Sequence, residues 1–289
     1  MSLVQHEGGW FVGARPAKTR GAPLLTNDVE VLITVKAYPQ PSKTHGESVC
    51  IAGVRLDTPS AQWCRLYPVD FRGLPEAQQF HKYDIIRCAA GRPRHDSRPE
   101  SLCPVLDTIE IAGSHPSWRD RWPLIEPLVA SSMCEIYELE RAQGTSLGLF
   151  KPGEILDFHI EGTDDEWDEG RHAVLNQQSL LPELAKRRPL EKMPYTFSFS
   201  HRCLSPTCKG HKQQIIDWEV CENYRKTRGY SEEQRRGLVR ERWLERVCGS
   251  TRDTYFYAGS ISRHRHTFVL LGAFWPPQNV VRPEVLALF

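Results

Sequence analysis

The sequence predicts an α+β protein, in which a small N-terminal β-barrel region precedes a C-terminal α+β domain with a zinc-binding loop. Three observations predict this. Five short strand-like segments, separated by Pro, Gly and Asp turns, are typical of a small closed barrel. Two helical segments lie between strands near the C-terminus. Near the start of the C-terminal region, Cys and His cluster in a loop.

Composition bounds the possibilities. A chain of 289 residues with 40% hydrophobic and 10% aromatic residues is long enough for two domains with real cores. The net charge of +1 excludes a globally basic protein, so any surface for nucleic acid must be local. No apolar run is long enough to span a membrane, and the N-terminus lacks the pattern of a secretory signal. Nine cysteines without such a signal indicate a reducing compartment, and we expect a cytoplasmic protein.

The barrel strands are expected where β-branched and aromatic residues alternate with polar ones. They are 29–36, 47–56, 62–69, 83–89 and 105–112. A short helix within 71–82 is expected to cap the barrel. Ser117 can cap a helix in which Trp118, Trp122 and Ile125 recur at helical spacing. Residues 146–162 have the pattern of strand, turn, strand. We therefore predict a flexible arm at 1–25, a β-barrel region at 26–175 and a zinc-containing domain at 193–289.

The C-terminal part opens with a strand at 195–200 and a loop at 201–210 that carries cysteines. Residues 213–227 and 231–247 are predicted to be helical, because Ser231 followed by Gln234 is a good helix start. Two further strands are expected at 253–259 and 267–275.

Cys203, Cys208 and His211 form a C-x4-C-x2-H pattern within that loop. Thiolates and imidazole are the ligands that tetrahedral Zn²⁺ prefers, so we predict a structural zinc ion here. Cys221, one helix segment downstream, is the first choice for the fourth ligand. His201, His264 and His266 are rivals, and the alternative is that these cysteines are simply buried apolar groups.

Asp217 and Glu219 follow the metal loop directly. Two nearby carboxylates can hold Mg²⁺ for phosphodiester cleavage, which suggests a nuclease using His211, Asp217 and Glu219. A helix over this segment would make the two carboxylates diverge, which favours a purely structural role for Asp217.

Local charge favours a polyanionic partner. Residues 201–266 contain 14 Lys and Arg residues against 8 Asp and Glu residues. Arg235, Arg236, Arg240, Arg242 and Arg246 cluster on one predicted helix, and Arg263 and Arg265 lie in the loop between the last two strands. An ordinary solvated helix face is the alternative.

The predicted barrel interleaves aromatic and cationic residues. Trp63, Arg65 and Tyr67 share one face of their strand, and a cation on that face is unusual for simple packing. With Arg72 and Lys82, this face suits stacking of bases and contact with phosphates.

The segments 49–53 (VCIAG), 63–69 (WCRLYPV) and 83–86 (YDII) carry a family resemblance. They resemble the dual OB-containing domain of bacterial proteins, which shows a Cys-x-Ala-Gly strand followed by a Trp-Ile-Arg-Pro-Val strand. The likeness covers residues 29–160. Here Leu66 and Tyr67 stand between Arg and Pro, which leaves open whether the barrel is single or double. The resemblance implies an OB-like fold and nucleic-acid binding in a mobile-element or phage-defence setting.

Our leading hypothesis is a protein that binds DNA or RNA. The alternatives are the metal-dependent nuclease and a module that binds another protein within a larger complex. The sequence has no Walker-type loop, no dinucleotide-binding glycine pattern and no G-x-S-x-G, which disfavours those chemistries.

Overall fold

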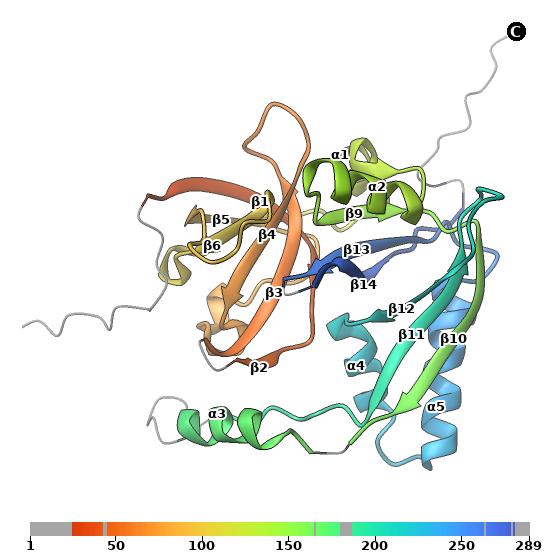
Figure 1. Cartoon of the computed structure of the whole chain (residues 1–289). Helices are drawn as coiled ribbons and strands as arrows, with labels where there is room; N and C mark the ends of the chain where they lie inside the picture. Colours follow the sequence, from red (N-terminus) through yellow and green to blue (C-terminus); the bar gives the residue numbers. More distant parts are fainter. Residues whose placement is uncertain are drawn as a thin grey trace, which may run out of the picture.

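The computed structural model describes residues 25–42, 45–164, 166–179, 187–262, 264–278 and 280. Two seven-stranded sheets dominate the fold, and helices cover the second sheet (Figure 1). The first sheet contains β1 Asn27–Lys36, β2 Gln40–Ser42, β3 Gly46–Arg55, β4 Gln62–Val69, β5 Asp84–Gly91, β6 Ser101–Pro104 and β7 Glu110–Ser114. The second contains β8 Val129–Ala130, β9 Leu147–Phe150, β10 Glu154–Gly162, β11 Tyr195–Arg202, β12 His211–Ile215, β13 Tyr255–Ile261 and β14 His264–Phe274.

Five helical segments join or cover these sheets. They are α1 Trp118–Ile125, α2 Met133–Gln143, α3 Glu169–Ser179, α4 Trp218–Lys226 and α5 Glu232–Arg240. A π-helical segment, η5 Glu241–Val247, continues α5, so the helix predicted over 231–247 is present. Ser231 caps α5 in a reciprocal arrangement with Gln234, as the sequence predicted. Ser117 likewise caps α1. No helix of the described part is long and apolar enough to cross a membrane.

The first sheet closes into a five-stranded barrel. Its strand order is β1-β3-β4-β6-β5, and β5 pairs back with β1. The pairing of β4 with β6 is parallel, whereas the other pairings of the closed barrel are antiparallel. This is the Greek-key order of an OB-like barrel. Two short 3-10 turns, η1 Phe71–Gly73 and η2 Glu76–Gln78, stand where the capping helix was expected.

The fifth barrel strand differs from the prediction. It is β6, only four residues long, whereas the expected strand at 105–112 is a turn followed by β7. All five β7 residues are exposed, and β7 pairs only with β5 outside the closed ring. A four-residue strand after a Pro- and Arg-rich segment carries too little alternation to be recognised from sequence.

The second sheet has the order β10-β11-β12-β14-β13-β9-β8. Within the described residues no pairing joins its ends, so it is an open sheet rather than a second barrel. It includes β9 and β10, whose residues were expected in the barrel region. Residues 211–215 form a strand rather than the start of the predicted helix, because they pair with β11 on one side and touch β14 on the other.

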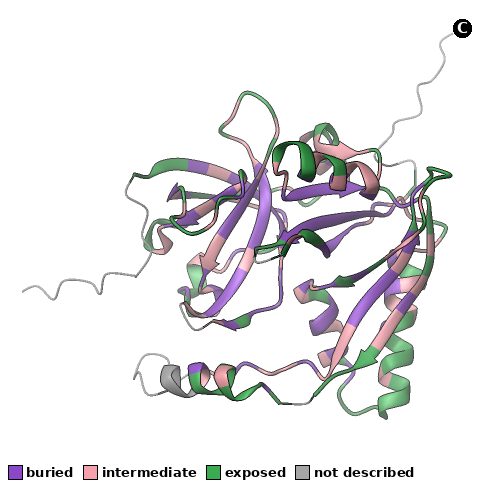
Figure 2. Cartoon of the chain, viewed as in Figure 1, coloured by how far each residue is buried: buried purple, intermediate pink, exposed green. Residues whose placement is uncertain are grey.

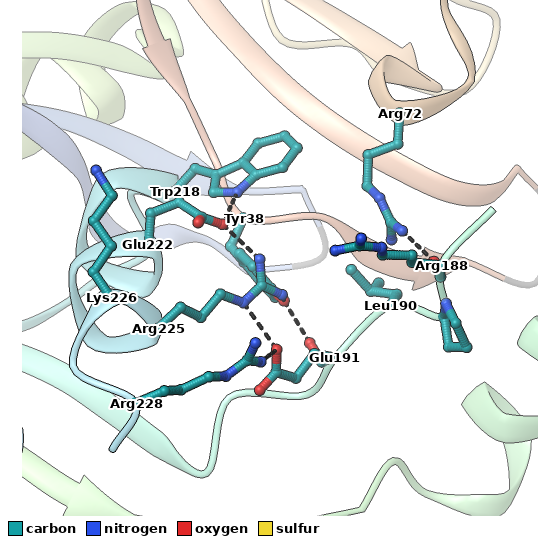
Figure 3. A pocket seen from close by; sticks show the side chains of 11 residues that line it. Tyr38, Arg72, Arg188, Leu190, Glu191, Trp218, Glu222, Arg225, Lys226 and Arg228 are labelled. Carbon is teal, nitrogen blue, oxygen red and sulfur yellow. Dashed lines mark hydrogen bonds and ion pairs between the residues drawn. The ribbon is translucent and has the colours of Figure 1, made fainter. Parts of the chain in front are cut away.

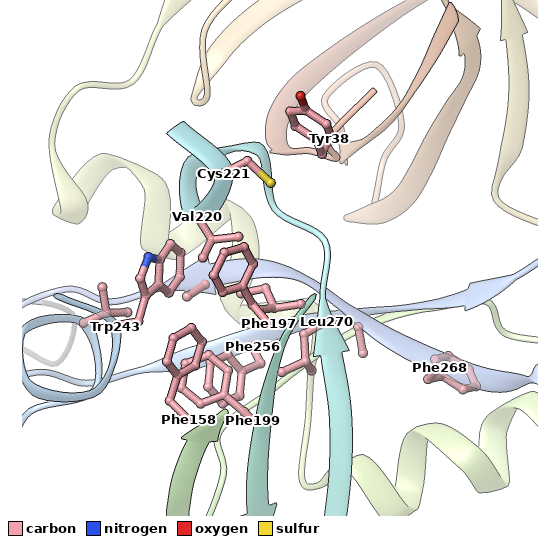
Figure 4. Packing of buried hydrophobic residues seen from close by; sticks show 14 of the residues in the cluster. Tyr38, Phe158, Phe197, Phe199, Val220, Cys221, Trp243, Phe256, Phe268 and Leu270 are labelled. Carbon is pink, nitrogen blue, oxygen red and sulfur yellow. The ribbon is translucent and has the colours of Figure 1, made fainter. Parts of the chain in front are cut away.

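The second sheet lies between two cores, because side chains of a strand alternate between faces. Tyr255 and Tyr257 of β13 point into the interface core, which also contains Leu32, Ala52 and Trp122. Phe256 and Ala258 point to the other face, into the helix-side core beneath α2, α4 and α5. Buried strands with exposed outer helix faces are evident in Figure 2. Figure 4 shows the aromatic packing of the helix-side core.

Candidate metal centre and cationic surface

Four potential metal ligands meet at one end of the second sheet. Cys203 follows β11, Cys208 lies in the loop, His211 begins β12, and Cys134 comes from the first turn of α2. Their ligand atoms all lie within 4.8 Å of one another. His211 Nε2 is 3.5 Å from Cys134 Sγ and from Cys203 Sγ, and 3.3 Å from Cys208 Sγ. The sulfurs of Cys134 and Cys203 are 3.8 Å apart.

These separations match the edges of a coordination tetrahedron. Bond lengths of about 2.3 Å to sulfur and about 2.0–2.1 Å to nitrogen give edges of about 3.8 Å between sulfurs and about 3.6 Å between sulfur and nitrogen. A Cys₃His cluster with this spacing could hold a metal ion without moving its ligands. Because all four positions belong to protein side chains, the arrangement is that of a closed site rather than one open to substrate.

The loop backbone supports Cys208 as a thiolate. The amide N–H groups of Cys203 and Gly210 donate to Cys208 Sγ at 3.3 and 3.4 Å. Burial alone would raise the pKa of Cys208, but these amide donors lower it below its usual value. Gly210 has a φ of 93°, a backbone conformation that residues other than glycine rarely adopt.

Aromatic rings fix the orientation of His211. His201 stacks on it at 5.1 Å between ring centroids, and Tyr137 of α2 stacks at 6.0 Å. His201 is fully buried and its Nε2 bonds to the Gln213 side chain at 2.9 Å. Burial lowers the pKa of His201 to about 4, so this ring is neutral. His201 is not one of the four clustered residues; it packs against the ring of His211.

The fourth ligand position differs from the prediction. The structure brings Cys203, Cys208 and His211 together as expected, but it adds Cys134, which precedes them by 69 residues or more. Cys221, the first choice from sequence, lies on α4 in the helix-side core near Tyr38 (Figure 4). His266 bonds to Glu140 instead, and His264 is exposed. The sequence carries one related signal. Ser132 caps a helix, and Cys134 lies in the first turn of that helix.

Asp217 and Glu219 do converge, but on a lysine. Asp217 caps α4, and Lys82 Nζ lies 3.6 Å from Asp217 Oδ2 and 3.2 Å from Glu219 Oε2. Lys82 also donates to the Ala273 carbonyl at 3.2 Å. The ammonium thus fills the position between the carboxylates that a divalent cation would need. His211 lies at the opposite end of β12, so the structure does not bring the three nuclease residues together.

The barrel face that carries Trp63 and Arg65 is covered by the second sheet. Trp63 packs edge-on against Tyr257 at 6.0 Å. Arg65 is 2% exposed, and its guanidinium donates to the carbonyl and hydroxyl oxygens of Ser146. The cation on the core side therefore serves an internal interface. Tyr67 is half-buried and accepts a hydrogen bond from Ser48 at 3.2 Å.

The remaining predicted cations are scattered. Arg72 pairs with Glu47 at 3.0 Å, and Arg265 donates to Ser97. Arg235 stacks over Tyr224 and pairs with Glu232 on α5. Arg236 is exposed, and Arg240 pairs with Asp157 at 2.6 Å. Arg263 lies outside the described residues.

A cationic surface runs along α4, and it combines Arg72, Arg242 and Arg246, which the sequence indicated, with four cations that it did not. Two hollows of about 500 and 470 Å³ adjoin, because Glu222 and Lys226 of α4 line both. We call their combined lining the α4 surface. Its cations are Arg72, Arg188, Arg225, Lys226, Arg228, Arg242 and Arg246, and its acids are Glu191, Glu219 and Glu222. Its aromatic rings are those of Tyr38, Trp218, Trp243 and Trp275. Figure 3 shows the first hollow.

Fold and site together define the class of protein: an OB-like barrel fused to an α+β region with a Cys₃His cluster. The chain belongs to the family described as domain of unknown function DUF8757, whose model matches residues 129–289. A second model, domain of unknown function DUF8758, matches residues 27–127. Neither is the dual OB-containing family that the sequence resembles. The two models divide the chain near residue 128, between the two sheets. No curated protein matches the sequence.

Three similar solved structures have low scores. A murine DNA-binding protein bound to double-stranded DNA is 8% identical, with a TM-score of 0.31; the match covers 86% of this chain and 94% of that one. The Ifi202 HINa domain in complex with 20-bp double-stranded DNA is 9% identical, with a TM-score of 0.30; the match covers 87% of this chain and 97% of that one. The tetrameric p202 HIN2 is 6% identical, with a TM-score of 0.28; the match covers 89% of this chain and 96% of that one. TM-scores this low support no inference about the present chain.

Proposed function

We propose that this protein binds nucleic acid through the α4 surface and that a structural zinc ion fixes the second sheet, against which α4 packs. The observation that carries the proposal is the composition of that surface, where seven cationic side chains and four aromatic rings meet only three acids. Cations that contact phosphates and rings that stack on bases are the usual elements of such a surface. Zinc suits the Cys₃His ligand set better than the other common metal ions.

One cation of the second hollow, Arg242, is supported by an aromatic ring. Arg242 and Arg252 both lie over the ring of Trp275, at 5.2 and 4.9 Å from its centroid. Arg246 pairs with Glu241 on its own helical segment. Within the described residues, Lys226 and Arg242 have no acidic partner at ion-pair distance, so their charges are available for phosphate.

Fluorescence anisotropy with DNA and RNA probes at about 50 and 200 mM salt tests this proposal. We expect affinity to fall steeply between the two concentrations. The double variant Lys226→Glu and Arg242→Glu should weaken binding of every probe and lower the salt slope by about one for each phosphate that is no longer neutralised. Arg141→Glu, a charge reversal at an exposed position of α2, is the control and should bind like the wild type. Wild-type affinity in the double variant would refute the α4 surface.

The same assay separates the alternatives. A metal-dependent nuclease would shorten the probe in Mg²⁺ or Mn²⁺, and Asp217→Ala would abolish the cleavage. No specific observation favours that reading, since Lys82 occupies the position between the two carboxylates. A protein-interaction module would bind none of the probes. The mobile-element or defence setting and the cytoplasmic location stay predictions.

A further inference from the structure

The first hollow of the α4 surface lies between three separate parts of the chain. Tyr38 and Arg72 come from the barrel, residues 188–191 from the segment before β11, and Trp218 and Arg225 from α4 (Figure 3). Its volume is about 500 Å³. Hollows of this size take groups as large as a small ligand, whereas a double helix presents its phosphates on a broad convex surface.

Guanidinium groups enter this hollow from opposite sides. Arg72 and Arg188 reach in from one wall and Arg225 from the other (Figure 3). Arg72 is matched by Glu47, and Arg225 is matched by Glu191 at 3.0 Å and by Glu222. Arg228 shares the same Glu191. In the part of the chain that the structure describes, no carboxylate pairs with Arg188 or Lys226, so the hollow has an excess of positive charge. Such an excess favours a bound anion, and guanidinium forks match phosphate oxygens.

The hollow also has an organised aromatic wall. Trp218 and Tyr38 meet edge to face at 6.2 Å, and the Trp218 Nε1–H donates to Glu222 at 2.9 Å. The Tyr38 hydroxyl donates to the Glu191 carbonyl and accepts from Arg225. These contacts hold both rings in place before any ligand arrives. Trp218 is only half-buried although it packs against the barrel. A preformed ring beside converging cations is suited to a base joined to its phosphate.

We propose that this hollow receives one unpaired nucleotide, with its phosphate between Arg188 and Arg225 and its base against Trp218, so that the protein prefers single-stranded nucleic acid. The inference rests on the proposed function and narrows it. A base in a duplex is stacked and paired, so it enters such a hollow only at the free-energy cost of unstacking and unpairing. A base in an unpaired strand avoids the cost of unpairing.

The test compares a single-stranded oligonucleotide with the blunt duplex of the same sequence, using the full chain and two variants. Arg188→Ala removes the unmatched guanidinium of the first hollow and Arg242→Ala a cation of the second, and neither breaks a described ion pair. We expect the wild type to bind the single strand about tenfold more tightly than the duplex. Arg188→Ala should lose that preference, and Arg242→Ala should weaken both probes and keep it.

Each outcome separates the two proposals. If both probes bind equally, or if Arg188→Ala keeps the single-strand preference, the nucleotide site is wrong while nucleic-acid binding stands. If neither probe binds, the proposed function itself fails. Quenching of tryptophan fluorescence by the single strand is an independent readout of the base, and it should be clearly smaller in Trp218→Phe, in which Trp243 and Trp275 of the α4 surface remain. Equal quenching in this variant and the wild type would also overturn the inference. Unchanged thermal unfolding of the variants shows that they are folded.

Discussion

At the scale of single residues, Cys134 determines whether the metal cluster has three ligands or four. Without its thiolate, the remaining Cys₂His set would leave one position open, which is the arrangement of a catalytic rather than a structural site. Cys221 is a more deeply buried thiol in the helix-side core and is not one of the four clustered residues.

We therefore expect Cys134→Ser to lose most of the bound zinc that the wild type retains after dialysis, whereas Cys221→Ser retains it. Elemental mass spectrometry of the purified proteins measures this. Equal zinc in both variants would mean that the ion is held by other residues. Removing the metal with a chelator should lower the thermal unfolding midpoint of the wild type, because binding energy at such sites is folding energy.

A second residue-scale prediction concerns acid. The Asp96 carboxylate receives the fork of Arg98 and the hydroxyl of Ser101, and Arg98 also donates to the Ser260 carbonyl of β13. Although burial opposes it, the Arg98 side chain lowers the pKa of Asp96 to about 2. A depressed carboxyl pKa contributes stability above its ordinary value of about 3.9, and this contribution is lost as the pH falls through 2. Asp96→Asn should unfold at a lower temperature than the wild type at neutral pH, and the difference between their unfolding temperatures should shrink between about pH 4 and 2. A difference that does not change with pH would contradict this.

Sequence reasoning anticipated the three clustered residues that are neighbours in the chain, but not the distant Cys134 that joins them. Cys203, Cys208 and His211 share one loop, so their spacing is informative. Cys134 comes from another element, and one sequence cannot show which of several cysteines the fold brings close. The interpretation of Arg65 failed for a related reason. Its position on the inward face was correct, but the partner that covers it lies 81 residues away.

At the scale of elements, β12 shows where local preference yields to tertiary pairing. Gln213 and Gln214 favour a helix, yet both pair with β11, and Ile215 also pairs with Leu270 of β14. Propensity differences of a few tenths of a kcal/mol per residue are easily outweighed by burial between two strands. The strands β11, β13 and β14 were predicted because their alternation is long and strong.

The metal loop ends in a turn that depends on glycine. Gly210→Ala should cost about 1–2 kcal/mol, since its positive φ disfavours a side chain even though an added Cβ would make only ordinary van der Waals contacts. Zinc should also be released at a lower chelator concentration, because the Gly210 amide donates to Cys208. Gly237→Ala in α5 is the matched control and should stabilise the protein by about 0.5–1 kcal/mol. Chemical unfolding with and without zinc measures both, and a stable Gly210 variant with normal zinc affinity would contradict the role of the turn.

At the scale of the whole molecule, the two sheets share a core and do not behave as separate bodies. The interface core combines barrel residues such as Leu32 and Ala52 with Leu149 and Leu271 of the second sheet. The five-strand barrel and the C-terminal α+β region were predictable because each carries its own alternation. Their joint packing was not, because a buried interface and a binding face have the same mixture of aromatic and cationic residues.

Arg65→Ala tests this interface. Removing the guanidinium leaves a cavity and deletes two buried hydrogen bonds to Ser146, so we expect a loss of about 3 kcal/mol in unfolding free energy. Nucleic-acid affinity per folded molecule should not change, because the residue is sealed between the sheets. A variant that is fully stable but binds nucleic acid weakly would restore Arg65 to a binding face.

The long separation between Cys134 and its three partners has a consequence for synthesis. The barrel is complete once residue 114 has left the ribosome, and domains generally fold as units during translation. The cluster cannot close until His211 has emerged as well. Until then the thiol of Cys134 has no cluster partners, so the proposed zinc ion could bind only late in synthesis. Oxidation of Cys134 during translation should therefore yield chains that have a folded barrel but cannot bind the ion.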